Sequence, residues 1–348
     1  MSYRIAINGF GRIGRCVLRA LYESRIGVDN AAYDGLEIVA INDLADVETL
    51  AYLTRYDSTH GRFVGEVETG KDALIVNSDE IRVCNTRNIS ELPWQELDID
   101  LVMECSGSFS DRATAEQHLH SGAKRLLFSQ PAENAVKAAV FGINHLDIEL
   151  QDRIISNASC TTNCIVPVIK CLDEGFGLES GMITTIHSAM NDQPVIDAYH
   201  HSDLRKTRSA MQSIIPVDTE IAKGIGRILP HMQGRFEGQA LRVPTVNVSA
   251  IDLTVTLNKH CSVEDLNAAI KSFSKTLPAN VLGYTQEPLA SCDFNHDPRS
   301  AVVDLSQTRV VAGSKHNLAR VLTWFDNEWA YANRMLDVAQ YLRKLTAQ

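Results

Sequence analysis

The segment Ser156–Cys164, SNASCTTNC, holds the most distinctive chemistry in this 348-residue chain. A strand is expected to end near Ser156, and the apolar run IVPVIKCLDE predicts a helix. Cys160 therefore falls at a helix N-terminus, where unpaired N–H groups and the helix dipole lower the pKa of a thiol. We identify Cys160 as a candidate nucleophile, whereas Cys164 and Cys171 are expected to be buried within the helix.

A nucleophilic cysteine needs a base beside it in the fold. Among the eleven histidines, His187 is the best placed, because it ends the expected strand GMITTIH. A paired imidazole can accept the thiol proton and later activate another nucleophile, which is typically worth ~10²–10⁴-fold in rate. Cys160 and Cys164 could also be read as metal ligands, but no second Cys/His pair follows at zinc-ligand spacing. No metal site is therefore expected.

A glycine-rich loop near the N-terminus predicts a dinucleotide site. Gly9–Gly14, GFGRIG, follows the expected strand RIAIN and precedes an expected helix over 15–22. Glycines permit a tight turn and close approach to a pyrophosphate, and the helix N-terminus supplies N–H donors. The candidate cofactor-binding residues are Phe10, Gly11, Arg12 and Ile13. The alternative is a turn that only packs helix on strand, but the strand before and the helix after favour the cofactor site.

The same site needs an acidic residue at the end of the second strand, where it binds the adenosine ribose. The strand EIVAIN ends at Asn42-Asp43, which makes Asp43 the candidate. Its spacing is longer than usual because Gly27–Gly35 has the character of an inserted loop. Glu37 lies nearer the usual spacing but begins the strand, at the wrong end of the sheet. A carboxylate at Asp43 repels a 2′-phosphate, so NAD is expected rather than NADP.

The order of the elements predicts two domains. Expected strands of the first half are Arg4–Asn8, Glu37–Ile41, Leu101–Glu104, Arg125–Phe128, Ala138–Gly142 and Arg153–Ser156. They alternate with helical stretches, which predicts a Rossmann-type doubly wound parallel sheet in an α/β fold. Expected strands of the second half are Met182–His187, Gly238–Val243, Val248–Leu257 and Arg299–Asp304. They predict an α+β catalytic domain with a mostly antiparallel sheet. The first domain is expected to cover residues 1–158 and the catalytic domain residues 159–326. A last helix is expected at Trp329–Leu345.

The composition argues against some classes of binding partner. Asp and Glu outnumber Lys and Arg, 43 to 33, and the resulting net charge of −10 argues against a general nucleic-acid binder. A few arginines can still converge on a small anion. No apolar run approaches the ~20 residues that span a bilayer, and no signal peptide is evident. We therefore expect neither a nucleic-acid nor a membrane partner, and a cytoplasmic location.

Several segments, in order along the whole chain, resemble the glyceraldehyde-3-phosphate dehydrogenase superfamily. They are NGFGRIGR, ECSG at 104–107, SNASCTTNC, TTIHSA, RVPTVNVS at 242–249 and WFDNEW at 324–329. The resemblance implies an NAD-dependent aldehyde dehydrogenase that forms a thioester on Cys160, with His187 as the base. It also implies a homotetramer, in which a loop over roughly Ser188–Ser213 lines the neighbouring subunit's cofactor site.

The resemblance assigns further cofactor residues. It implies that Asn327 orients the nicotinamide carboxamide, with Tyr331 nearby, and that Ser106 and Ser129 also bind NAD. It implies, too, that the C-terminal helix, 327–348, packs back on the NAD-binding domain and completes it.

Two departures point to one branch of the superfamily. The usual Thr three residues after the base is Met190 here, which removes a hydroxyl from the phosphate site. The usual loop PTxTGAAKA is PVDTEIAK in this chain. Within the stretch Asp218–Glu220, Thr219 is retained and the residue after it is a carboxylate instead of the usual glycine. With QPVIDAYH and DFNHDPRSAVVD-x-x-QTRV, these changes resemble the D-erythrose-4-phosphate dehydrogenase branch. That branch hydrolyses its thioester with water to give 4-phosphoerythronate, early in pyridoxal 5′-phosphate biosynthesis.

The expected substrate is a small aldose phosphate. Its candidate ligands are Ser159, Thr161, Asp192, Arg205, Arg208, Thr219 and Arg242. Ser159 and Thr161, with the backbone N–H of Cys160, are candidates for holding phosphate or an oxyanion. Arg242 and Thr219, with either Arg205 or Arg208, would bind the substrate phosphate. The stretch Tyr199–Ser202 is one residue longer than either branch pattern.

Two rival functions follow from the same residues. The first is phosphorylating glyceraldehyde-3-phosphate oxidation, which depends on inorganic phosphate. The second is a non-enzymatic NAD-binding regulatory protein with the same fold. The intact pair of Cys160 and His187 speaks against the second, because a binding protein needs neither.

Overall fold

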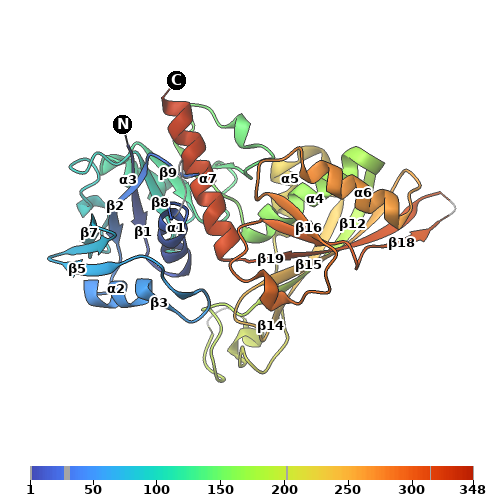
Figure 1. The fold of residues 1–348 in the computed structure, drawn as a ribbon, viewed down its shortest axis with the longest axis horizontal. Coiled ribbons are helices and arrows are strands. Elements are labelled where there is room, and N and C mark those ends of the chain that lie inside the picture. The colour runs from blue at the N-terminus through green and yellow to red at the C-terminus, as the bar shows by residue number, and fades with distance from the viewer. Residues whose placement is uncertain (1, 27–31, 201–202, 314, 348) are drawn as a thin grey trace. The chain divides into compact units, whose positions relative to one another are not determined.

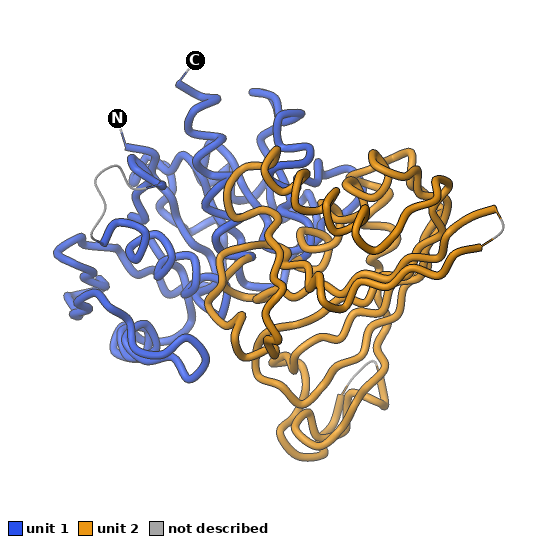
Figure 2. The backbone as a smooth tube through the Cα atoms, turned by 45° about the vertical axis from the view of Figure 1, so that its right-hand side comes forward, with its two compact units in different colours: residues 1–159, 331–348 blue, residues 160–330 orange. Residues whose placement is uncertain are grey.

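The computed structural model describes residues 2–26, 32–200, 203–313 and 315–347 (Figure 1). The chain forms two compact units, residues 1–159 with 331–348 and residues 160–330 (Figure 2). The expected inserted loop, Gly27–Gly35, lies partly outside the described residues, and so does the expected extra residue near Tyr199–Ser202.

The first unit is built on one large sheet. Its strands are β1 (Tyr3–Asn8), β2 (Leu36–Asn42), β5 (Val67–Gly70), β6 (Ala73–Val76), β7 (Asp79–Cys84), β8 (Leu101–Glu104), β9 (Arg125–Phe128), β10 (Lys137–Ala138) and β11 (Ile154–Ser156). Among the described residues their order is β10-β11-β9-β8-β1-β2-β7-β6-β5 (Figure 1). Neighbours from β10 to β7 are parallel, whereas β7-β6-β5 is an antiparallel meander. A small hairpin pairs β3 (Tyr56–Asp57) with β4 (Gly61–Arg62).

The helices that accompany these strands lie between them in the sequence, except for the C-terminal helix. They are α1 (Arg12–Glu23), α2 (Val47–Arg55), α3 (Arg112–His120) and the C-terminal α7 (Trp329–Thr346), with 3₁₀ turns η1 (Ile89–Glu91) and η2 (His145–Asp147). Strands β8 and β9 are buried along their whole length, as parallel strands covered on both faces are. The strand order reverses between β1 and β8, which is the topological switch point where dinucleotides bind in such sheets.

The second unit is a sheet with helices on one face (Figure 1). Its strands are β12 (Leu178–Ser188), β13 (Ile215–Val217), β14 (Phe236–Val243), β15 (Ser249–Leu257), β16 (Leu282–Thr285), β17 (Ala301–Asp304), β18 (Arg309–Ala312) and β19 (Asn317–Phe325). Its helices are α4 (Cys160–Phe176), α5 (Ile221–Ile228) and α6 (Val263–Ser274), with 3₁₀ turns η3 (Leu204–Thr207), η4 (Pro230–Met232) and η5 (Ser291–Phe294).

Strand pairing in this second sheet is mostly antiparallel. The order is β13-β14-β12-β15-β19-β17-β16, with β18 on β19; β12–β14 and β16–β17 are the parallel pairs among the described strands. Alternate residues of β15 are buried beneath the helices, the pattern of a strand with one covered face. The predicted fold class, a doubly wound parallel sheet plus a mostly antiparallel α+β domain, is confirmed.

One expected strand is wrong. Of Ala138–Gly142, only Ala138 lies in a strand, β10. The side chain of Asn144 replaces the strand partner, because it accepts from the Val140 N–H at 2.7 Å and donates to the Ala138 carbonyl at 3.0 Å. Gly142, at φ +84°, completes the turn. Local side-chain hydrogen bonds have therefore displaced the sheet pairing that the apolar pattern predicted.

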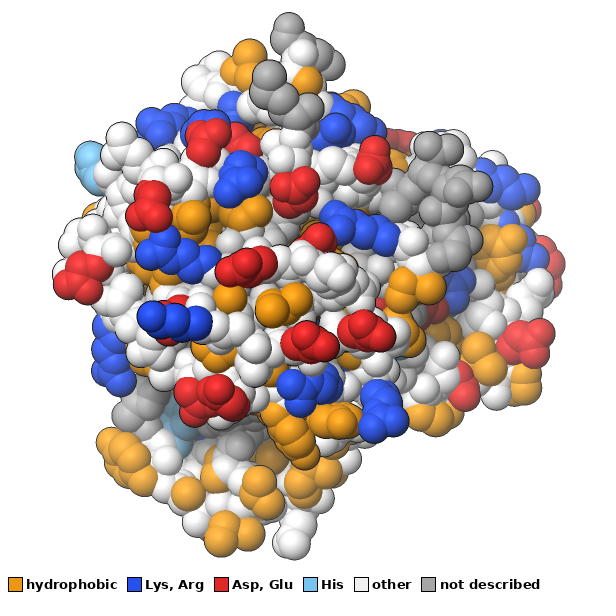
Figure 3. Space-filling model, turned by 60° about the vertical axis from the view of Figure 1, so that its left-hand side comes forward, with side chains coloured by type: hydrophobic (Ala, Val, Ile, Leu, Met, Phe, Trp, Pro, Cys, Tyr) orange, Lys and Arg blue, Asp and Glu red, His pale blue; other side chains and the backbone are white. Residues whose placement is uncertain are grey.

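The surface mixes charges. Acidic and basic side chains are interspersed over the face drawn in Figure 3. Among the residues that the structure describes, no helix is both long and apolar enough to cross a bilayer.

The loops after β1 and β8 meet backbone to backbone, which gives a test of the switch point. Gly9 has φ +90°, and a Cβ there would lie 2.4 Å from the Ser106 Cα and N atoms. We expect Gly9→Ala to lower the free energy of unfolding by roughly 1–3 kcal/mol or more, since strain and overlap add. Gly11→Ala is the control, because a Cβ at Gly11 would meet nothing within 4 Å. Equal thermal unfolding midpoints for the two variants would contradict this packing.

Candidate active site

Cys160 is the first residue of α4, after a turn that leaves the end of β11. In this turn Ala158 has φ +53°, a left-handed conformation that costs a non-glycine residue free energy. Ser156 Oγ accepts from the Ala158 N–H at 3.1 Å, and the Tyr331 hydroxyl donates to the Ala158 carbonyl at 2.8 Å. Hydrogen bonds to both the N–H and the carbonyl of Ala158 thus hold the turn in place. Tyr331, which we expected near the cofactor, is buried with its hydroxyl bound to this turn.

The thiol of Cys160 faces the imidazole of His187, with 3.7 Å between Sγ and Nε2. The other ring nitrogen, Nδ1, lies 2.8 Å from the carbonyl oxygen of Ser188. A carbonyl only accepts hydrogen bonds, so Nδ1 carries the proton and Nε2 turns its lone pair towards the thiol. The structure therefore brings the candidate nucleophile and base together, in the tautomer that a base requires.

Arg242 stands beside the base. His187 on β12 pairs in register with Arg242 on the parallel strand β14, so both side chains leave the same face of the sheet. The Nε and Nη1 atoms of Arg242 are buried and have no hydrogen-bond partner among the described residues. A buried donor that is left without a hydrogen bond costs free energy. These unmet donors therefore suit an anion such as a phosphate.

The electrostatics of the pair differ from the sequence-based expectation. Desolvation raises the pKa of the Cys160 thiol to about 11, although the Arg242 charge and backbone N–H groups act to lower it. The predicted lowering of this pKa is therefore wrong, because desolvation outweighs the helix N-terminus. Burial, reinforced by the Arg242 charge, lowers the pKa of His187 to about 4. At neutral pH the pair is a thiol beside a neutral imidazole.

An anion at Arg242 would change this balance. It would cancel part of the positive potential that disfavours a proton on His187 and so raise the pKa of that base. The arrangement thus couples occupation of the anion site to the strength of the base.

Asp192 forms an ion pair with Lys206 at 2.9 Å. Partial burial raises the pKa of Asp192, but the Lys206 hydrogen bond and the charges of Lys206 and Arg242 outweigh it, so the net shift is downward. Lys206 is a charged partner of Asp192 that was not among the residues predicted for the site. The signal was available, because Lys206 stands in the run DLRKTR between the two arginines that we did single out.

Those two arginines, Arg205 and Arg208, are both exposed. Arg208 forms an ion pair with Asp197 at 2.8 Å. Within the described ranges, no hydrogen bond or ion pair joins either of them to Arg242.

The loop before α5 carries the expected acidic residues. Asp218 is exposed, and Thr219 Oγ1 accepts from the Ile221 N–H at 3.3 Å. Glu220 lies 2.7 Å from the Lys223 ammonium, in an exposed ion pair. Lys223, in the first turn of α5, is therefore already paired with a carboxylate from the loop.

Three other residues singled out from the sequence lie close to Cys160 or His187 along the chain. Ser159 and Thr161 flank Cys160 and are partly exposed. Met190, two residues after β12, is 45% exposed and ends in a thioether, which donates no hydrogen bond.

The glycine loop of the first unit fits a dinucleotide. Helix α1 begins at Arg12 with no capping side chain at Gly11 and no acidic residue in its first turn. Gly11 is exposed with open space beside it, and the partly exposed Ile13 follows in the first turn. A pyrophosphate can approach such a terminus closely. The guanidinium of Arg12 binds Asp57 with two contacts, of 2.5 and 3.1 Å.

Asp43 follows β2 and belongs to the same loop system. One carboxylate oxygen accepts from the N–H of Phe10 at 2.7 Å, and the other from the N–H of Ala45 at 3.0 Å. Ser106 and Ser129 follow β8 and β9; the Ser106 N–H donates to Glu104 Oε1 at 2.8 Å. The Ser129 N–H donates to the Glu104 carbonyl at 3.0 Å. The first-unit cofactor candidates other than Tyr331 thus lie along the carboxyl edge of the sheet.

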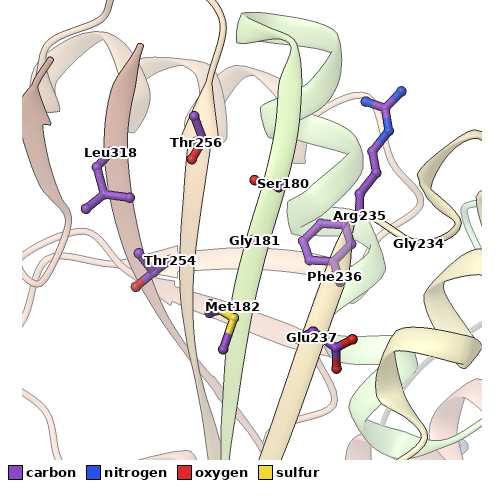
Figure 4. Close-up of a pocket in the computed structure, with 10 residues that line it drawn as sticks. All are labelled: Ser180, Gly181, Met182, Gly234, Arg235, Phe236, Glu237, Thr254, Thr256 and Leu318. Atoms are coloured by element: carbon purple, nitrogen blue, oxygen red, sulfur yellow. The ribbon is translucent and has the colours of Figure 1, made fainter. Parts of the chain in front are cut away.

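A shallow hollow on the second unit lies apart from this chemistry (Figure 4). It has a volume of about 260 Å³ and is lined by residues that include Met182, Phe236 and Leu318. Met182 and His187 differ by an odd number of positions on β12, so their side chains leave opposite faces of the sheet. The hollow therefore opens away from the Cys160–His187 pair.

We expect alkylation of Cys160 by iodoacetamide to accelerate with pH around a midpoint above 9, because only the thiolate reacts and its pKa is raised. Arg242→Gln should move this midpoint higher still, since a charge that lowers the pKa is lost. Arg320→Gln is the control, because Arg320 binds Asp252 on the outer face of the same sheet. Mass spectrometry of the Cys160 peptide gives the rate. A midpoint below that of an ordinary thiol, about 8.5, would contradict the expectation.

Each of the two units contains a segment that matches a domain of one known protein family. The model of the glyceraldehyde 3-phosphate dehydrogenase NAD binding domain matches residues 3–112, and the model of the C-terminal domain of the same family matches residues 159–327. The first match shows NAD to be the cofactor. Together the matches cover most of the chain, including the glycine loop, Cys160 and His187. The chain therefore belongs to the glyceraldehyde-3-phosphate dehydrogenase superfamily of NAD-dependent aldehyde dehydrogenases.

Proposed function

We propose that this protein oxidises D-erythrose 4-phosphate to 4-phosphoerythronate, with water rather than inorganic phosphate ending the cycle. The reaction would be an early step of pyridoxal 5′-phosphate biosynthesis. The observation that carries the proposal is the state of the loop before α5. There the Lys223 ammonium is paired with Glu220, which stands where the superfamily usually has glycine. Such a loop offers inorganic phosphate little net positive charge.

Met190 supports the same proposal. It stands where phosphorylating members usually have a threonine, and its thioether cannot replace the missing donor. Arg242 has two buried donors that no described residue matches, and in the proposal they bind the phosphate of the substrate itself. Its partners in the proposal are Thr219, Asp192 with its ion-pair partner Lys206, and either Arg205 or Arg208.

The first step joins Cys160 to the aldehyde. Sγ bonds the carbonyl carbon while the thiol proton passes to Nε2 of His187 and on to the carbonyl oxygen, which gives a hemithioacetal. The hydroxyls of Ser159 and Thr161 and the Cys160 N–H stabilise the charge that develops on oxygen. His187 suits this role because its low pKa leaves Nε2 unprotonated at neutral pH.

Oxidation and hydrolysis follow. When bound, NAD⁺ would be the two-electron oxidant of this step. His187 accepts the hemithioacetal hydroxyl proton as the thioester forms, and releases it to solvent. It then takes a proton from water as that water attacks the acyl carbon, and returns the proton to the departing sulfur.

The proposal includes the cofactor residues and the assembly. Phe10, Gly11, Arg12 and Ile13 would bind the pyrophosphate, Asp43 the adenosine ribose, and Asn327 the nicotinamide carboxamide. Ser106 and Ser129 complete this set, in a NAD-binding domain of residues 1–158 and 327–348 beside a catalytic domain of 159–326. We further propose a cytoplasmic homotetramer, from the superfamily resemblance.

The aldose assignment is tested by NADH formation from the two candidate aldehydes. With D-erythrose 4-phosphate, we expect a kcat/KM more than about tenfold above that with glyceraldehyde 3-phosphate, the range over which one carbon unit discriminates. Inorganic phosphate should leave the rate unchanged. Strict phosphate dependence with preference for the triose would support phosphorylating glyceraldehyde-3-phosphate oxidation instead.

Two sets of variants sharpen this test. Met190→Thr combined with Glu220→Gly should make turnover respond to inorganic phosphate, because it restores a donor and releases Lys223. Lys259→Gln, at an exposed site before α6, is the matched surface control. Cys160→Ala should abolish turnover of either aldehyde, and dehydrogenase activity in this variant would overturn the thioester scheme.

A further inference from the structure

The side-chain amide of Asn327, just after β19, contacts two serine hydroxyls. Oδ1 of Asn327 lies 3.0 Å from Ser188 Oγ and 2.8 Å from Ser249 Oγ. The two serines are also linked to each other, because the Ser188 N–H donates to Ser249 Oγ at 3.1 Å. Ser188 and Ser249 are 0% and 1% exposed, so their polar atoms depend on these partners.

The orientation of the amide follows from the donors and acceptors available. Ser249 Oγ already accepts one hydrogen bond, from the Ser188 backbone. Among the described residues, Oδ1 of Asn327 is the acceptor available to both hydroxyl protons. A flipped amide would put its NH₂ group there and leave two buried hydroxyl protons unpaired, which is costly.

The NH₂ group of Asn327 is therefore turned away from the serines. It makes no hydrogen bond to a described residue, and Asn327 is partly exposed. We propose that Ser188 and Ser249 are positioning residues, which hold this NH₂ group ready to donate to the carbonyl oxygen of the nicotinamide carboxamide. The proposal rests on the proposed function, which assigns Asn327 to the cofactor.

Ser188 has a second role in the same unit. Its carbonyl accepts from Nδ1 of His187 at 2.8 Å and so fixes the tautomer of the base. One residue at the end of β12 thus sets the base through its backbone and the amide of Asn327 through its side chain. The two roles are separable, since Ser188→Ala removes the hydroxyl and keeps the carbonyl.

Calorimetric titration of the full-length protein with NAD⁺ and with ADP-ribose, which lacks nicotinamide, tests the proposal. We expect Ser188→Ala and Ser249→Ala each to weaken NAD⁺ binding about three- to tenfold, the range for loss of one neutral hydrogen bond. ADP-ribose binding should be unchanged. Thr184→Ala is the matched control, because it removes from the same strand a partly exposed hydroxyl that accepts from Gln239 and has no hydrogen bond to Asn327 among the described residues.

Equal losses of affinity for NAD⁺ and ADP-ribose would show that the serines support only the fold, and would overturn the proposal. Unchanged NAD⁺ binding would overturn it as well. Asn327→Ala should reproduce the selective loss, and failure to do so would overturn the role of Asn327 in the cofactor site as well. No aldehyde enters the titration, so an error in the aldose assignment leaves its outcome unaffected. The pH profile of Cys160 alkylation should be the same in Ser188→Ala, and a shifted profile would count against the separation of the two roles.

Discussion

The partly buried positive charge of Arg242, two of whose donors have no hydrogen bond to a described residue, governs the chemistry of the second unit. The guanidinium of Arg242 lowers the pKa of both the Cys160 thiol and the His187 imidazole, but burial acts on the two groups in opposite senses. At the thiol burial opposes the charge and exceeds it, whereas at the imidazole the two effects add. The outcome is a neutral pair, 3.7 Å apart, rather than a preformed ion pair. Reactivity in such a site depends on what neutralises Arg242.

The strands bring this chemistry together by where they begin and end. β12 ends at Ser188, β15 begins at Ser249, and Asn327 follows the end of β19. Pairing of β12 with β14 aligns His187 with Arg242. Asp326, fully buried, then fixes the chain direction after β19, because its carboxylate accepts from the N–H groups of Glu328 and Trp329. Strand pairing and backbone hydrogen bonds therefore position the site residues together with side-chain contacts.

Regular patterns in the sequence predicted the elements that carry the site. The apolar run after Cys160 and the strand ending at His187 both form, so the expected nucleophile and base could be located. The thiol pKa could not be predicted, because desolvation depends on atoms from segments far apart in the chain. Ion pairs such as Asp192–Lys206 arise from loop conformations that have no sequence period. The false strand at 138–142 failed for a related reason, since one asparagine side chain replaced the expected pairing.

The two hydrogen bonds that Asp43 accepts bear on how cofactor preference could be altered. In its proposed role at the adenosine ribose this carboxylate would repel a 2′-phosphate, and it also ties the N–H of Phe10 to the N–H of Ala45 and so helps to build the glycine loop. A small apolar residue chosen to admit NADP would remove the repulsion and both acceptors together, and asparagine would keep only one of the two acceptors. Redesign towards NADP therefore has to supply a new acceptor for the Phe10 N–H along with a cation for the extra phosphate. With Asp43 in its proposed role, selectivity between the two dinucleotides and integrity of the loop would reside in the same side chain.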